Sequence, residues 1–162
     1  MSVGEMGTAR HAAGEDRRPV VVAVSRERGS VTALTWAWQE AQLRRAPLIA
    51  VTPWRPPLPS PGPSPRPALA PVSADEVHQQ VEEELTRLVH RVLGPQSEVT
   101  THALKGGTTS VLIEAATGAQ LLVLEPPQPN RAAGLVTGRR VHRISTTVAC
   151  PVVVMPAATN VI

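Results

Sequence analysis

The sequence predicts an α/β protein in which five short strands form one doubly wound parallel sheet, with helices on both faces. Short apolar runs rich in valine and leucine alternate with longer segments whose apolar residues recur every three or four positions. The short runs are apolar throughout, which is typical of parallel strands buried on both faces. The connections between them are short, so successive strands are expected to lie parallel and to be joined by right-handed crossovers.

The first apolar run, Val20–Val24, is the first expected strand. Gly29 and Ser30 precede a predicted helix that ends before Pro47, and Leu48–Thr52 is the second expected strand. The core face of this helix is expected to consist of Leu34, Ala37, Trp38 and Ala41, which have the spacing of residues on one helix face.

A proline-rich segment, residues 53–72, interrupts the alternation and contains nine of the 17 prolines. Proline has no N–H group to donate and favours extended backbone, so we expect neither helix nor central strand here. The favoured interpretation is an exposed insertion between the second strand and the second helix. The alternative is a docking segment for an aromatic groove of the SH3 kind.

Ser73 and Glu76 form the sequence pattern of a capping box and predict the start of the second helix. Gly94 and Pro95 predict its end. The glutamates at residues 82–84 predict that one side of this helix faces solvent. The opposite, apolar face is expected to consist of Val77, Val81, Leu85, Leu88 and Val92.

The rest of the chain predicts two more helices and three more strands. The glycines at residues 106–107 turn into a short helix that Gly118 closes, and Gly138 is expected to open the last helix. The core faces of these helices are expected to hold Val111, Leu112 and Ala115, and then Val141, Ile144, Ser145 and Val148. The strands are expected at Glu98–Leu104, on a sheet edge, and at Leu121–Leu124 and Val152–Met155.

At 162 residues, the chain has the length of one domain with a single core. We expect this domain at residues 19–157, between tails at residues 1–18 and 158–162. No apolar run approaches the roughly 20 residues of a membrane span, and the polar amino terminus has no apolar core of a signal peptide. The single cysteine excludes an internal disulfide and fits a reducing compartment. These features predict a cytoplasmic protein that does not enter a membrane.

The charge of the chain makes nucleic acid an unexpected partner. The formal net charge is only +3, although the sequence pI is about 10.4. Proteins that bind nucleic acid concentrate positive charge and add stacking aromatic residues, whereas this chain has no phenylalanine or tyrosine.

The sequence also lacks the patterns of common phosphate-transfer enzymes. Its only aspartates are Asp16 and Asp75, and neither follows a predicted strand, where a receiver domain or a metal-dependent phosphoryl transferase needs carboxylates. There is no GxxxxGK[ST] motif, and the five histidines show no metal-ligand spacing with cysteine or acidic residues. We therefore expect neither an enzyme nor a bound metal.

Polar residues at the expected ends of strands and starts of helices are the candidates for ligand binding. Ser25 follows the first strand, where it faces a ligand crevice or simply ends the strand. Arg139 and Arg140 fall in the expected first turn of the last helix, after Gly138, where the helix dipole favours an anion. Either a phosphate-bearing ligand or a solvated basic face, paired with Glu125, accounts for these arginines.

Two further features are open to more than one interpretation. The loop at residues 105–109, Lys-Gly-Gly-Thr-Thr, fits either an anion site or a simple turn and helix cap. Cys150 precedes a proline and an apolar strand, and is expected to be a small buried apolar residue.

Two segments resemble the universal stress protein family. The run VVVAVSRERGSVTALTWAWQEAQLRRAPLIAV, Val20 to Val51, is similar to the family's first strand, first helix and second strand. Gly138 and, twelve residues later, the run Cys150–Val154 have the spacing that is typical of the family's closing segment. The resemblance covers nearly all of residues 19–156. It implies a Rossmann-like sheet of order 3-2-1-4-5, like that of the adenine nucleotide alpha hydrolases.

Nucleotide-binding members of that family carry an aspartate after the first strand and a Gly-x-x-Gly-x9-Gly-Ser/Thr pattern near the end. On this chain the aspartate position falls on Ser25 and the hydroxyl position on Arg139. The three glycine positions fall on Glu125, Gln128 and Gly138. The resemblance therefore implies a degenerate site, where ATP binds weakly or not at all. The candidate nucleotide or anion site consists of Ser25, Val51, Gly138, Arg139 and Arg140.

We expect a non-enzymatic, universal-stress-protein-like binding or sensor module of a stress response, without a cofactor and with a protein partner. The resemblance implies a homodimer through the last strand, at Val152, Val153 and Val154. One alternative is a protein that binds ATP or another phosphorylated nucleotide through Gly138 and the adjacent arginines. The least expected alternative is a nucleotide hydrolase, because the strand ends carry no aspartate.

Overall fold

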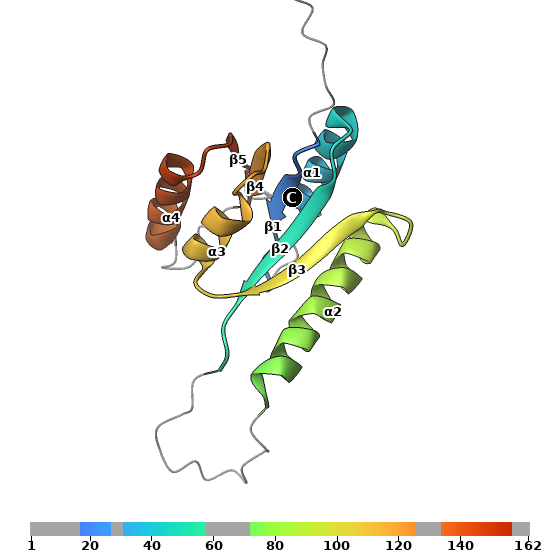
Figure 1. The fold of residues 1–162 in the computed structure, drawn as a ribbon, viewed down its shortest axis with the longest axis vertical. Coiled ribbons are helices and arrows are strands. Elements are labelled where there is room, and N and C mark those ends of the chain that lie inside the picture. The colour runs from blue at the N-terminus through green and yellow to red at the C-terminus, as the bar shows by residue number, and fades with distance from the viewer. Residues whose placement is uncertain (1–16, 27–30, 58–71, 126–133, 157–162) are drawn as a thin grey trace, which may run out of the picture.

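The computed structural model describes residues 17–26, 31–57, 72–125 and 134–156, and for residues 134–137 it describes the backbone alone. Residues 1–16 of the expected N-terminal tail, the expected C-terminal tail and most of the proline-rich segment therefore lie outside the described residues. Strands and helices alternate along the chain (Figure 1). The elements are β1 (Val20–Ala23), α1 (Val31–Arg44), β2 (Leu48–Trp54), α2 (Ala74–Leu93), β3 (Val99–Lys105), α3 (Thr108–Ala115), β4 (Leu121–Leu124), α4 (Gly134–Thr147) and β5 (Val152–Val154).

The five strands form one sheet in the order β3-β2-β1-β4-β5, and every neighbouring pair is parallel. This confirms the predicted fold class and strand order. Val20 of β1 lies opposite Leu48 of β2 on one side and Leu121 of β4 on the other. The first apolar run of the chain is thus the central strand, where both faces and both edges of a strand are covered.

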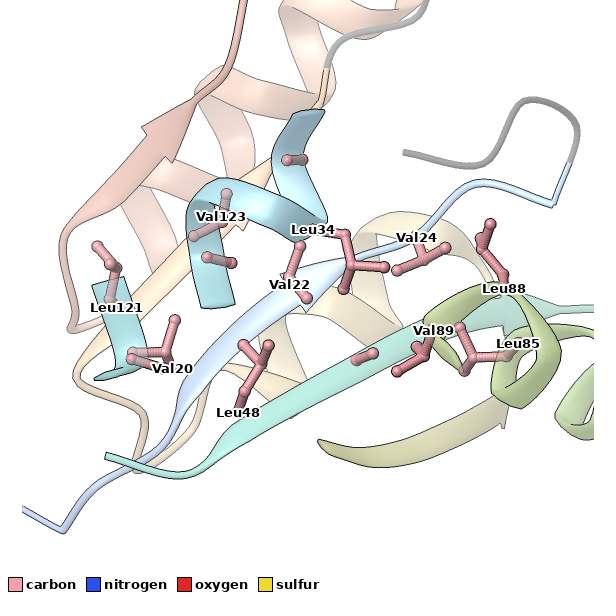
Figure 2. Close-up of a cluster of buried hydrophobic side chains, with 14 residues drawn as sticks. Val20, Val22, Val24, Leu34, Leu48, Leu85, Leu88, Val89, Leu121 and Val123 are labelled. Atoms are coloured by element: carbon pink, nitrogen blue, oxygen red, sulfur yellow. The ribbon is translucent and has the colours of Figure 1, made fainter. Parts of the chain in front are cut away.

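Helices cover both faces of the sheet, and each face has its own core. Val20 and Val22 of β1 pack with residues of α1 and α2 such as Leu34 and Leu85 (Figure 2). Val21 points to the opposite face and packs in the cluster that includes Val111, Leu112 and Ile144, from α3 and α4. Successive residues of a strand point to opposite faces, so the unbroken valine run of β1 serves two cores at once.

The second strand continues through Pro53 to Trp54, so the prediction that no strand residue lies in residues 53–72 was wrong at its first two positions. The Val51 carbonyl accepts from the Val24 N–H on the β1 side, whereas the Trp54 carbonyl accepts from the Gly106 N–H on the β3 side. Backbone groups alternate in direction along a strand, so Pro53 faces the β1 side beyond the end of β1. No neighbour there requires the N–H that proline lacks.

The second helix begins with the predicted capping box. The Ser73 hydroxyl accepts from the Glu76 N–H at 3.1 Å, and the Glu76 carboxylate accepts from the Ser73 N–H at 2.9 Å. Gly94, at φ 91°, ends the helix.

The glutamates at residues 82–84 are not simply a solvated side, which corrects the prediction. The Glu82 carboxylate accepts from the Ala103 N–H of β3, and Glu84 pairs with Arg26 at 3.5 Å. The Thr86 and Thr101 hydroxyls also bond each other, at 3.1 Å. Helix α2 therefore lies over the outer edge of β3 and satisfies a backbone group that an uncovered edge strand would expose.

Candidate functional site

The carboxyl ends of the parallel strands form one edge of the sheet, and the connection changes face between β1 and β4. The chain leaves β1 toward α1 on one face and leaves β4 toward α4 on the other. Ligands of open parallel sheets bind at such a switch point, outside the carboxyl ends of the strands. The candidate site is therefore the group of residues that follow β1, β2, β3 and β4.

Residues at the ends of β1 and β2 are joined by hydrogen bonds. The Val24 N–H donates to the Val51 carbonyl at 2.8 Å, and the buried Thr52 hydroxyl donates to the Val24 carbonyl at 3.0 Å. The Val51 side chain lies in the core on the α3 and α4 face and is 1% exposed. Of the predicted site residues, Val51 is thus a buried core residue whose carbonyl already has a donor, and Ser25 is an exposed residue two positions beyond β1.

The chain beyond β1 is held against α2. The Arg26 guanidinium lies 3.5 Å from the Glu84 carboxylate, and both side chains are about two-fifths exposed, at 42% and 39%. Solvent screens such a pair, so its contribution to stability is about 1 kcal/mol or less. Glu84 therefore orients the residue after Ser25 without fixing it rigidly.

Gly138, Arg139 and Arg140 do not lie where the sequence pattern placed them. Helix α4 begins at Gly134, so Gly138 is its fifth residue and the arginines fall in its second turn. The prediction that Gly138 opens the helix was therefore wrong. Gly138 has no positive φ, and a Cβ atom there would meet nothing within 4 Å. A glycine inside a helix costs only about 1 kcal/mol relative to alanine, so the helix can continue through Gly138 and does not have to begin there.

The two arginines are exposed, and the helix dipole effect falls off beyond the first turn, so the dipole gives them no anion site. Ser145, expected on the core face of this helix, is also exposed, whereas Ile144 is 2% exposed.

A second candidate group, Arg55 and the glycines after β3, lies where β2 and β3 end. Trp54 lies opposite Lys105 in the strand register, so the next residue, Arg55, reaches the loop after β3. A Cβ atom on Gly107 would lie 2.6 Å from Nη2 of Arg55, which shows that the guanidinium lies directly over this glycine. Gly107 is also the N-cap of α3, and it has no side chain that could cap the first backbone N–H groups of this helix.

Sequence reasoning found only half of this group. The Lys-Gly-Gly-Thr-Thr loop was recognised as a possible anion site, but Arg55 was missed because it belonged to the proline-rich segment. The register between Trp54 and Lys105 is the signal that joins them, and it depends on a strand boundary that the prolines hid.

A buried aromatic group lies on the opposite face of β2, under α2. Trp54 is 6% exposed and packs with Val77, Val81 and Ala103. The His78 ring stacks on the indole with centroids 5.5 Å apart and 9° between the planes. The indole Nε1–H has no partner among the described residues, which is an uncommon state for a buried donor. No local pattern predicted the pairing of Trp54 with His78, because the two residues are 24 positions apart.

The single cysteine lies at the other end of the sheet, just before β5. Burial raises the pKa of the Cys150 thiol, and a backbone hydrogen bond and the charge of Arg18 partly oppose this. A thiol with a raised pKa is a poor nucleophile, and Cys150 packs in the apolar cluster of α3 and α4. This confirms the predicted role as a small buried residue.

The described part of the chain shows neither a cluster of metal ligands nor a helix that could span a membrane. Nowhere in the described ranges do three or more histidine, cysteine, aspartate or glutamate side chains come together as metal ligands would. Among the described helices, none is both long and apolar enough to cross a membrane.

The sequence matches the model of the universal stress protein family over residues 16–156. No match was found among curated proteins. Solved structures of universal stress proteins share the fold. One, in complex with cAMP, is 18% identical, with a TM-score of 0.60, and the alignment covers 88% of this chain and 98% of that one.

Two further structures give similar values. UspA from Lactobacillus plantarum is 20% identical with a TM-score of 0.59, and 86% of this chain and 97% of that chain are covered. A universal stress protein from Archaeoglobus fulgidus in complex with dAMP is 16% identical with a TM-score of 0.55, with 85% and 96% covered. At these identities the likeness concerns the fold alone.

Proposed function

The chain belongs to the universal stress protein family, and from this premise we propose that it is a dimeric, non-enzymatic binding or sensor module whose nucleotide site is degenerate. The observation that carries the dimer is the open edge of β5. Among the described strands, β5 pairs only with β4, and its three residues are all valine. An apolar strand with one unpaired edge favours pairing with another strand.

The direction of the backbone groups indicates how a second copy would bind. The Pro151 carbonyl accepts from the Leu122 N–H, and the Met155 N–H donates to the Leu124 carbonyl, so both residues face β4. Because direction alternates along a strand, the N–H and C=O groups of Val152 and Val154 face the open side. Two copies related by a two-fold axis at Val153 would exchange these groups in an isologous, antiparallel pair.

Val154→Pro tests this proposal. Val154 is 41% exposed and its N–H points away from β4, so proline removes a donor that only a second copy would use. Light scattering coupled to size exclusion should show a dimer for the wild type and a monomer for Val154→Pro. Val154→Thr, which keeps the N–H and the shape, is the matched control and should remain dimeric. A wild-type protein that is monomeric at high micromolar concentration would refute the dimer.

The residues at the switch point support weak binding of ATP or none. Glu125, half-buried after β4, brings a negative charge where a family glycine would approach the phosphates, and the Val51 carbonyl already has a donor. Arg139 and Arg140 lie outside the first turn of α4. We therefore expect a dissociation constant for magnesium ATP of about 1 mM or weaker, which corresponds to a binding free energy of about −4 kcal/mol.

A second candidate function is the binding of another phosphorylated nucleotide, which related folds in complex with cAMP and dAMP support. Calorimetry with magnesium ATP, dAMP and cAMP separates the two proposals. A submillimolar constant for ATP would contradict the degenerate site. Tight binding of dAMP or cAMP alone would favour the second candidate, and Arg139→Ala and Arg55→Ala would then show which cations contact the phosphate.

A further inference from the structure

We infer that the outward face of α4 is a docking surface for an acidic segment of a partner protein. This surface, the α4 basic face, consists of Arg139, Arg140 and Arg143, all exposed. Residues of an α-helix are separated by about 100°, so these three side chains fall within an arc of about 100°. Ile144, 2% exposed, fixes the direction of the core. Around the helix axis, Arg140 lies about 40° from Ile144, Arg143 about 100° and Arg139 about 140°, so the basic face extends from the flank of the core contact to the solvent side of α4.

Nothing in the described structure neutralises this face. Among the described residues, none forms an ion pair with Arg139, Arg140 or Arg143. Helix α4 contains no acidic residue. By contrast, Arg26, Arg44 and Arg87 each lie within 4 Å of a glutamate. The arginines of α4 are therefore the part of the described helical surface where positive charge gathers without a partner.

The hydroxyl groups beside the basic face already donate hydrogen bonds within α4, so the arginines are the groups of this face that remain to bind a partner. The Ser145 and Thr146 hydroxyls donate to the His142 carbonyl at 3.0 Å and 2.9 Å, and the Thr147 hydroxyl donates to the Arg143 carbonyl at 2.6 Å. Guanidinium groups bind carboxylates through two parallel hydrogen bonds, which makes a row of aspartates or glutamates a fitting partner.

The charges around the face favour a short acidic segment over nucleic acid or an anionic membrane. The net charge of the chain is only +3, so a long polyanion gains little beyond the face itself. The chain has no phenylalanine or tyrosine, and α4 has no tryptophan, so none of the large aromatic side chains on which bases stack lies on this helix.

This inference rests on the proposed binding role but not on the dimer, because one protomer carries the whole face. The test is fluorescence anisotropy of a fluorescein-labelled glutamate-rich peptide, with light scattering on the same samples to report the oligomeric state separately. The variant is Arg139→Gln with Arg143→Gln. The matched control is Arg87→Gln with Arg91→Gln, which removes the same charge from the exposed side of α2.

We expect the α4 variant to weaken peptide binding by about tenfold or more in low salt, and the α2 control by about twofold or less, because screening limits distant charges. A peptide with glutamine in place of glutamate should not bind. Equal losses in both variants, absence of binding to the wild type, or tighter binding of duplex DNA or anionic vesicles than of the peptide would each overturn the inference. Loss of the dimer without loss of peptide binding would refute only the proposed assembly.

Discussion

The adjacent glycines at residues 106 and 107 provide a test of the described turn after β3. Gly106 has φ +148°, and a Cβ atom there would lie 2.9 Å from Cγ2 of Val111. Val111 is 4% exposed and packed in the core, so it has little room to move. Gly107 has φ −72°, which any residue adopts, and its Cβ would meet only the end of the flexible Arg55 side chain.

Gly106→Ala should therefore destabilise the fold strongly. A non-glycine residue in this backbone region costs about 1–3 kcal/mol, and overpacking against a core side chain costs about 1–3 kcal/mol more. We expect a total loss of about 2–4 kcal/mol of stability, which is less than the sum of the two costs, because one small backbone shift relieves part of both the backbone strain and the overpacking. For a domain of this size each kcal/mol lowers Tm by about 2–4 °C, so Tm should fall by about 10 °C.

Gly107→Ala is the matched control and should change stability by about 1 kcal/mol or less. Alanine is a slightly poorer N-cap than glycine, whereas it lowers the entropy of the unfolded chain, and the two effects oppose each other. Urea unfolding and thermal melts followed by circular dichroism compare both variants. Equal stability of the two variants, or an unaffected Gly106→Ala, would show that the turn does not have the described backbone.

Two more predictions concern α2 and the cysteine. Glu82→Ala leaves the buried Ala103 N–H without its acceptor, so urea unfolding should show a loss of about 1–2 kcal/mol of stability. The Ala103 amide should also exchange its hydrogen faster, and an unchanged exchange rate would contradict this hydrogen bond. Because burial raises the pKa of Cys150, the folded state keeps the thiol proton to a higher pH than the unfolded state does. The free energy of unfolding should therefore fall as the pH rises above the ordinary thiol pKa, since the unfolded state then loses this proton more readily. A thiol reagent at pH about 8 should react slowly with the native protein and rapidly in urea, where the thiol has its ordinary pKa of about 8.5; equally fast reaction in both would refute the burial of Cys150.

Local patterns were sufficient for most of the fold. The valine run at Val20–Ala23 predicted a strand buried on both faces, since such a strand is apolar at every position and shows no alternation. Ser73 and Glu76 predicted the start of α2 to the residue, because the capping box involves neighbours along the chain. The resemblance to the family added the strand order.

The candidate site was predicted less well, since it depends on residues far apart in the sequence. The contact of Arg55 with Gly107 and the bond from Ala103 to Glu82 follow from the register of β2, β3 and α2. Pro53 fits in a strand only because β1 has already ended beside it. The sequence by itself determined which segments would be strands and helices, because periodicity and capping act between near neighbours. Only the tertiary structure decided which side chains meet at the ends of the strands, because one residue of shift in register changes every contact across a sheet.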